Sequence, residues 1–178
     1  MLPRQSLTLG VLLSLLTVGP ALAQGNEGQA IVVYGQGGGF STLADLNDPG
    51  TADFKTGFNT GGGVAYQVSK HVAVRGIFTY ARATARDPQS TAFDGTKFNR
   101  LFYGGDIQLR LPFASGVAPY VFAGGGAATI DPQGSATASF TKGAGRAGLG
   151  ISYDLPGTPV SLSSEGAGWI YKWDRLGY

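Results

Sequence analysis

Charged side chains recur at alternate positions within apolar stretches of this chain, and they are the first candidates for chemistry. In residues 98–112, Arg100 and Asp106 share one parity, while the other parity is almost entirely apolar. Because successive side chains of a strand point to opposite faces, this pattern predicts a strand with one apolar and one charged face. The same reasoning predicts one interior set of charged side chains: Arg75, Arg100, Asp106, Arg110, Arg146, Asp154 and Glu165.

Two other patterns suggest chemistry but lack the context that the chemistry requires. Residues 143–148 spell G-x-G-x-x-G, yet a dinucleotide site needs that motif between a strand and a helix. Here the motif lies inside an alternating strand pattern that runs to a Pro-Gly turn. His71 is the only histidine and lies in a short turn, so we do not expect it to serve a Ser-His-acid triad. We therefore predict no catalytic residue, no enzymatic activity and no cofactor.

A cluster of oxygen-bearing side chains in the first polar segment could hold a hard cation such as calcium. Its members are Asp45, Asn47, Asp48 and Asp53. Their spacing does not match an EF-hand loop, and loops are commonly rich in Asp. The sequence therefore predicts no metal site.

Seven stretches with strand-like patterns could position these charged residues. They cover residues 30–40, 56–68, 72–81, 98–112, 118–130, 142–155 and 160–173. Polar or turn-forming segments separate them, and these connections alternate long and short along the chain. The faces of residues 118–130 stay unassigned because the small side chains there suit either parity. The pattern predicts an all-β, antiparallel up-and-down sheet.

The amino-terminal residues 1–23 are typical of a secretory signal peptide. Arg4 supplies a positive charge, residues 7–18 are apolar, and Ala21-Leu22-Ala23 resembles a cleavage site. The apolar run is too short to cross a bilayer as a helix. We expect a mature chain of residues 24–178 that forms one domain.

Composition excludes several classes of protein. The 13 basic and 11 acidic residues form no basic block, so nucleic acid is not an expected partner. The chain has no cysteine, which excludes a disulfide framework and a lipoprotein-type anchor. No mature segment approaches the roughly 20 apolar residues of a transmembrane helix. A membrane-bound form would therefore cross the bilayer as strands.

Aromatic residues are predicted to form two girdles at membrane interfaces, where Tyr and Trp are favoured. They are Tyr66, Tyr120 and Tyr153 near short turns, and Trp169, Tyr171 and Trp173 at the far end of the last strand. The charged faces must then point into the barrel. An Arg or Lys that faced lipid at the midplane would cost roughly 2–4 kcal/mol.

The signal sequence, the alternating strands, the loop rhythm and two glycine-rich segments together resemble a known family. The segments are GGGVAY (residues 61–66) and PYVFAGGGAA (residues 119–128). The chain is similar to the small bacterial outer-membrane β-barrel domain family, which includes OmpA-type and OmpW-type barrels. The resemblance implies an eight-stranded transmembrane β-barrel in the outer membrane of a Gram-negative cell. It also implies outer-membrane lipid and the barrel-assembly machinery as partners.

The end of the chain departs from the family pattern. Seven strands are visible, whereas such barrels have an even number and a last strand that returns to the periplasm. Asp174, Arg175 and Gly177 break the alternation that a terminal strand needs. We therefore expect that the chain is truncated at its carboxyl end and lacks the eighth strand.

The charged residues are expected to fill the barrel as ion pairs, because an eight-stranded barrel is only wide enough for side chains. A hairpin between the third and fourth strands would place Arg75 opposite Gln108 and diagonal to Asp106. The leading hypothesis is a non-catalytic barrel with a structural or surface-interaction role through its external loops. The alternatives are a narrow channel for small or hydrophobic solutes and a soluble exported barrel that binds a ligand.

Overall fold

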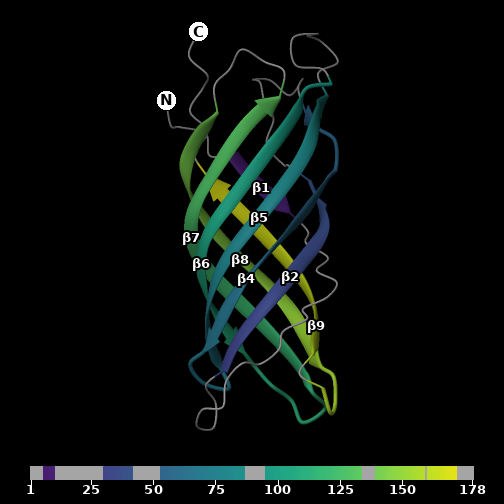
Figure 1. Cartoon of the computed structure of the whole chain (residues 1–178), viewed down its shortest axis with the longest axis vertical. Coiled ribbons are helices and arrows are strands. Elements are labelled where there is room, and N and C mark those ends of the chain that lie inside the picture. Colours follow the sequence, from purple (N-terminus) through teal and green to yellow (C-terminus); the bar gives the residue numbers. More distant parts are fainter. Residues whose placement is uncertain are drawn as a thin grey trace.

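The computed structural model describes residues 6–10, 30–41, 53–86, 95–133, 139–158 and 160–171. Seven long strands form one antiparallel sheet in which each strand pairs with its neighbour along the chain. They are β2 (Ala30–Phe40), β4 (Gly57–Gln67), β5 (Val72–Arg86), β6 (Lys97–Arg110), β7 (Val117–Gln133), β8 (Phe140–Asp154) and β9 (Ser161–Tyr171). The strands are strongly tilted and wind around one long axis (Figure 1). The prediction of an all-β, up-and-down barrel fold with seven strands is confirmed.

The strands extend further toward one end than the sequence pattern indicated. β5 continues to Arg86, and β7 continues to Gln133. The two-residue strand β3 (Asp53–Phe54) pairs with the end of β5. The connection between β7 and β8 (residues 134–139) is therefore no longer than the turn between β6 and β7 (residues 111–116). The sequence pattern had predicted a long connection between β7 and β8. No helix in the described ranges is long and apolar enough to cross a membrane.

The sheet has two edges, one formed by β2 and the other by a short additional strand. This strand, β1 (Ser6–Gly10), pairs antiparallel with β9, and Ser6 lies opposite Tyr171. β1 belongs to the residues predicted to form the signal peptide, and it takes the place beside β9 that an eighth strand would take. Cleavage after residue 23 would leave the outer edge of β9 without this partner.

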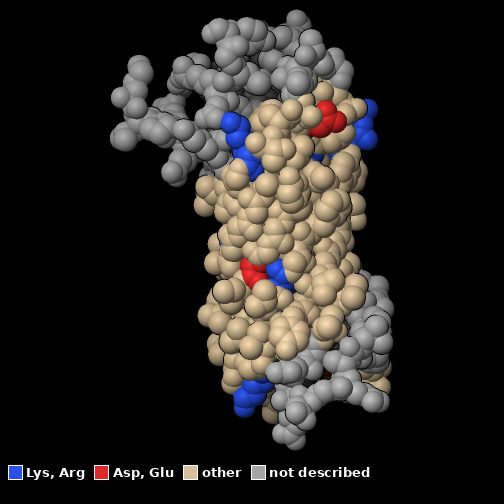
Figure 2. All heavy atoms as spheres, turned by 60° about the vertical axis from the view of Figure 1, so that its left-hand side comes forward, with Lys and Arg blue, Asp and Glu red and all other residues tan. Residues whose placement is uncertain are grey.

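The two faces of the sheet differ sharply in chemistry. Large apolar side chains cover the outer face and are between 36% and 65% exposed. In the view of Figure 2 one acidic and one basic group lie side by side near mid-height of an otherwise uncharged surface, and the other charged side chains lie toward the two ends. Such an apolar outer band is what lipid requires of a barrel, because the hydrocarbon core cannot solvate charge.

Glycines on the inner face of β8 leave room for aromatic rings from β7. A Cβ atom added to Gly148 would lie 2.4 Å from the ring of Phe122. One added to Gly150 would lie 2.4 Å from the ring of Tyr120. Since neighbouring inner residues of a narrow barrel crowd one another, the large side chains of one strand need small partners on the next. Glycine therefore determines where the interior can hold aromatic rings.

Candidate functional site: the filled barrel interior

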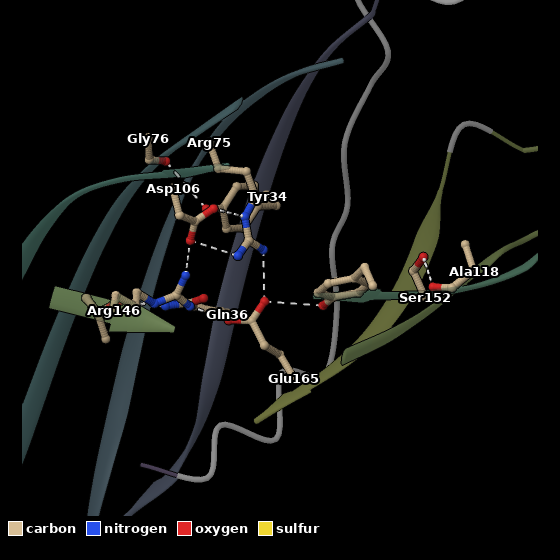
Figure 3. Close-up of polar contacts among 11 residues, drawn as sticks. Tyr34, Gln36, Arg75, Gly76, Asp106, Ala118, Arg146, Ser152 and Glu165 are labelled. Carbon is tan, nitrogen blue, oxygen red and sulfur yellow. Dashed lines mark hydrogen bonds and ion pairs between the residues drawn. The ribbon is translucent and has the colours of Figure 1, made fainter. Parts of the chain in front are cut away.

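Four charged side chains from four strands meet inside the barrel, and we call them the charged cluster. They are Arg75 on β5, Asp106 on β6, Arg146 on β8 and Glu165 on β9. Each lies on the inner face of its strand and is no more than 7% exposed. Figure 3 shows the two carboxylates approaching the two guanidinium groups from different sides of the interior. The cluster joins opposite walls of the barrel.

Every member of the charged cluster contacts two members of opposite charge. Arg75 donates to Asp106 from Nε to Oδ1 at 2.6 Å and from Nη2 to Oδ2 at 2.9 Å, and its Nη1 donates to Glu165 Oε2 at 2.8 Å. Arg146 donates from Nη1 to Asp106 and from Nη2 to Glu165. The alternation of charge leaves the cluster electrically neutral. That neutrality matters because an unpaired buried ion carries a desolvation cost of several kcal/mol.

Aromatic side chains surround the charged cluster. The guanidinium carbons of Arg75 and Arg146 lie 4.4 and 4.2 Å from the ring centroid of Phe122, a cation–π geometry. The hydroxyl of Tyr120 donates to Glu165 Oε2 at 3.2 Å. The hydroxyl of Tyr34 donates to a backbone carbonyl of β5 at 3.4 Å (Figure 3). These contacts hold the long arginine side chains in one arrangement. The aromatic rings also fill the space beside the charged cluster.

A second layer, which we call the apolar plug, fills the end of the barrel from which the long connections leave. Its buried members are Phe40, Ala81, Ala83, Ala85, Phe98, Phe102, Ala128, Ile130, Ala144 and Trp169. The rings of Phe102 and Trp169 stack with their centroids 4.8 Å apart. Arg100 is fully buried beside this layer, and its guanidinium carbon lies 5.6 Å from the centroid of Phe40. The interior at this end is therefore mainly apolar, not polar as the sequence predicted.

The remaining predicted charges lie at the opposite end, beside the short turns. Arg110 Nη2 donates to the hydroxyl of Ser152 at 3.0 Å and lies 3.8 Å from Asp154 Oδ1. The side chain of Asp154 is 57% exposed and accepts a 2.6 Å hydrogen bond from Ser161. The structure therefore divides the seven predicted residues among three places: the charged cluster, the apolar plug with Arg100, and this rim.

The predicted pairing of the hairpin between β5 and β6 was wrong by two residues. Arg75 lies directly opposite Asp106, and Ala73 lies opposite Gln108. A shift of two residues keeps every side chain on its face, so alternation alone cannot detect it. The long connection between these strands also sets no register. This direct pairing allows two nitrogens of Arg75 to bind the two carboxylate oxygens of Asp106.

The girdle prediction was wrong for two of its six aromatic residues. Tyr120 is 5% exposed and Trp169 is 4% exposed, and both point into the barrel. The reason is packing: Tyr120 lies over Gly150, and Trp169 stacks on Phe102.

The other girdle residues differ in what the structure says of them. Tyr66 and Tyr153 face outward near the short turns and are 43% and 39% exposed. Tyr171 pairs through its backbone with Ala144, but its side chain lies outside the described part of the structure, as does all of Trp173. The girdle itself stays a prediction.

Reasoning from the sequence missed the aromatic residues of the interior, above all Tyr34 and Phe122. A signal was present, because Phe98 and Phe102 are apolar residues on the charged face of their strand. Glycines at alternate inner positions of the neighbouring strand also marked the space that Phe122 occupies. Combining both patterns would have required the register between strands.

The remaining motifs gain no chemical role from the structure. Residues 143–148 lie within β8, so G-x-G-x-x-G is part of a strand here. His71 is exposed in the turn between β4 and β5. In the acidic cluster, Asp45, Asn47 and Asp48 lie outside the described residues, and only the backbone of Asp53 is described. No group of three or more potential metal ligands occurs among the residues that the structure describes.

An up-and-down antiparallel sheet that is apolar outside and filled with paired charges and aromatic rings defines a transmembrane β-barrel. The sequence matches the family model of the outer membrane protein beta-barrel domain over residues 9–160, and the chain belongs to that family. Membership implies localisation in the outer membrane. No curated protein and no solved structure matches the chain in the corresponding searches.

Proposed function

We propose that this protein is a non-catalytic outer-membrane barrel with a structural or surface-interaction role. In this proposal a signal peptide directs export, the barrel-assembly machinery inserts the chain, and the long connections face the outside of the cell. The barrel then serves as a rigid support for these connections, which contact external partners. The family assignment supports the membrane barrel, and the filled interior supports the absence of transport.

The observation that carries the proposal is that the interior is blocked at two levels. The charged cluster joins β5 and β6 to β8 and β9 through four ion pairs. The apolar plug fills the end from which the long connections leave, with stacked rings and a row of alanines. A solute would have to separate buried charges and then pass a dry apolar layer, and both steps are costly.

The two alternatives from the sequence fit the structure less well. A channel for small solutes needs a continuous path, which both filled layers oppose. A soluble barrel for an apolar ligand needs an apolar interior and a polar exterior. This chain shows the reverse at mid-height, where Arg75 and Asp106 point inward and Ile107 is 56% exposed outside.

Conductance in planar lipid bilayers tests the proposal. We expect the folded full chain to insert and to give no discrete conductance steps. A variant that shortens both stacked rings, Phe102→Ala with Trp169→Ala, is the control for residual pathways through the apolar plug, and it should also stay silent because the charged cluster remains. Regular steps with the unaltered protein would contradict a filled barrel and favour the channel.

A further inference from the structure

Three basic residues lie together on the outer face of the barrel, at the end from which the long connections leave. Arg82 on β5 lies opposite Asn99 on β6, and Lys97 on β6 lies opposite Thr84 on β5. The backbone of Lys55 donates a 2.9 Å hydrogen bond to the carbonyl of Thr84, which places Lys55 on the other side of β5. We call Lys55, Arg82 and Lys97 the basic rim. It spans adjoining segments of the sheet.

Among the side chains that the structure describes, none neutralises the charges of the basic rim through an ion pair. Within the described ranges, none of the three side chains forms an ion pair or a hydrogen bond. Lys55 and Lys97 are exposed, and Arg82 is half-buried. Two acids share this face by register: Asp53, two residues before Lys55 and opposite Arg86, and Asp131, opposite Asn99. The carboxylate of Asp131 accepts a 2.6 Å hydrogen bond from Gln133. The three basic residues outnumber these two acids, so the described part of this face has a net positive charge.

Aromatic side chains lie directly beside the basic rim on the side of the apolar band. Phe58 on β4 is the cross-strand partner of Arg82 and is 53% exposed. The rings of Phe58 and Tyr80 lie 6.4 Å apart, and the hydroxyl of Tyr80 donates to Asn99 at 2.8 Å. Further into the band, Phe78 is 50% exposed. Along the outer face of β5 a cation, a phenol and a bare ring follow one another as Arg82, Tyr80 and Phe78. Phe58 and Asn99 flank Arg82 on the neighbouring strands.

This order of chemistry matches the order of groups in a phospholipid. Basic side chains next to a membrane attract anionic headgroups, and aromatic rings lie at the boundary between headgroups and acyl chains. We propose that the basic rim binds the phosphate of a lipid headgroup, with an acyl chain lying along Phe58 and Phe78. The inference rests on the proposed function for the orientation of the barrel in the membrane. It adds a specific lipid site to a surface that was otherwise expected to contact lipid without selection.

Native mass spectrometry of the full chain folded in neutral-detergent micelles tests this site. The probe is phosphatidic acid, whose headgroup is a bare phosphate, and the comparison lipid is diacylglycerol with the same acyl chains. We expect the unaltered protein to retain phosphatidic acid in preference to diacylglycerol. The variant Lys55→Gln, Arg82→Gln and Lys97→Gln should bind phosphatidic acid on the order of 100-fold more weakly, because each basic residue contributes separately. The single variant Arg82→Gln should lose about fivefold.

Lys70→Gln is the matched control, because Lys70 is an exposed lysine in the short turn at the opposite end of the barrel. It should bind phosphatidic acid as the unaltered protein does. Equal binding by the triple variant, or equal loss with Lys70→Gln, would overturn the site. Inorganic phosphate is titrated separately, and competition at concentrations equal to those of the lipid would show a free-phosphate site and contradict a lipid site.

Two further measurements separate this inference from the proposed function. Heat-modifiable mobility in gel electrophoresis establishes that each variant is folded before binding is measured. If a variant does not fold, the single variant Arg82→Gln still decides the outcome. Conductance steps would contradict the filled barrel while leaving selective phosphatidic acid binding intact, whereas loss of selectivity in a silent barrel would overturn only the lipid site.

Discussion

The charged cluster and the apolar plug fill the same barrel by opposite means. The charged cluster depends on four long side chains that each need partners of opposite sign. The apolar plug depends on shape, with Phe102 and Trp169 stacked among small alanines. Removing one part of a buried ionic network leaves an unpaired charge, whereas removing one apolar side chain leaves a cavity. The charged cluster should therefore tolerate single substitutions less well than the apolar plug.

Arg146 connects the two regions. Its guanidinium group binds both carboxylates of the charged cluster. The guanidinium carbon Cζ also lies 5.6 Å from the ring centroid of Trp169 in the apolar plug. Glu165 and Trp169 lie on the inner face of the same strand, β9. Because β9 and β2 are not hydrogen-bonded to each other, these interior contacts help to hold the curled sheet around its axis.

Asp106→Ala should have the largest effect, because Asp106 binds both arginines of the charged cluster. We expect a loss of about 3–5 kcal/mol in the free energy of unfolding, since two buried guanidinium groups would share one carboxylate. Urea unfolding in lipid vesicles, followed by tryptophan fluorescence, measures the change. An unchanged midpoint would show that the ion pairs do not support the barrel.

Phe102→Ala should lower the free energy of unfolding by about 3 kcal/mol, because it removes one ring of the stacked pair and leaves a cavity in the apolar plug. The same urea titration measures it. Phe102→Leu, which keeps much of the volume, is the control and should recover most of the loss. A loss larger than that of Asp106→Ala would reverse the comparison between the two regions.

Gly148→Ala should destabilise the barrel by about 1–3 kcal/mol, because the added Cβ would lie 2.2 Å from the carbonyl oxygen of Gly166 and against the ring of Phe122. Gly143→Ala is the matched control on the same strand, since an added Cβ there meets nothing within 4 Å. Equal stability of both variants would mean that inner glycines are not needed to seat the rings beside the charged cluster.

Asp154→Ala should have the smallest effect, below about 1 kcal/mol, because this exposed carboxylate lies 3.8 Å from Arg110 at the rim. The comparison with Asp106→Ala isolates the influence of burial on the same chemical change. If both substitutions lowered the urea midpoint equally, burial would not be the reason for the sensitivity of the charged cluster.

Much of the fold could be predicted because strand alternation and turn residues are local properties. Residues 98–112 were predicted as a strand with a charged face, and β6 has that form. The faces of β7 could not be assigned, since Ala123, Gly124 and Gly125 fit either side of a strand. Only the glycines of β8 opposite Phe122 and Tyr120 decide which face of β7 is inside.

Alternation and turn residues were enough to predict the strands, their order and the parity that places Arg75, Asp106, Arg146 and Glu165 on one side of the sheet. Those features follow from the two-residue period of a strand and from the cost of charge in lipid. Which charges meet depends on the folded barrel, because register and curvature set distances across the interior. The folded barrel therefore provides information that alternation lacks. It also moved Tyr120 and Trp169 from the expected membrane girdle into the barrel, where their neighbours on other strands provide the space that their rings fill.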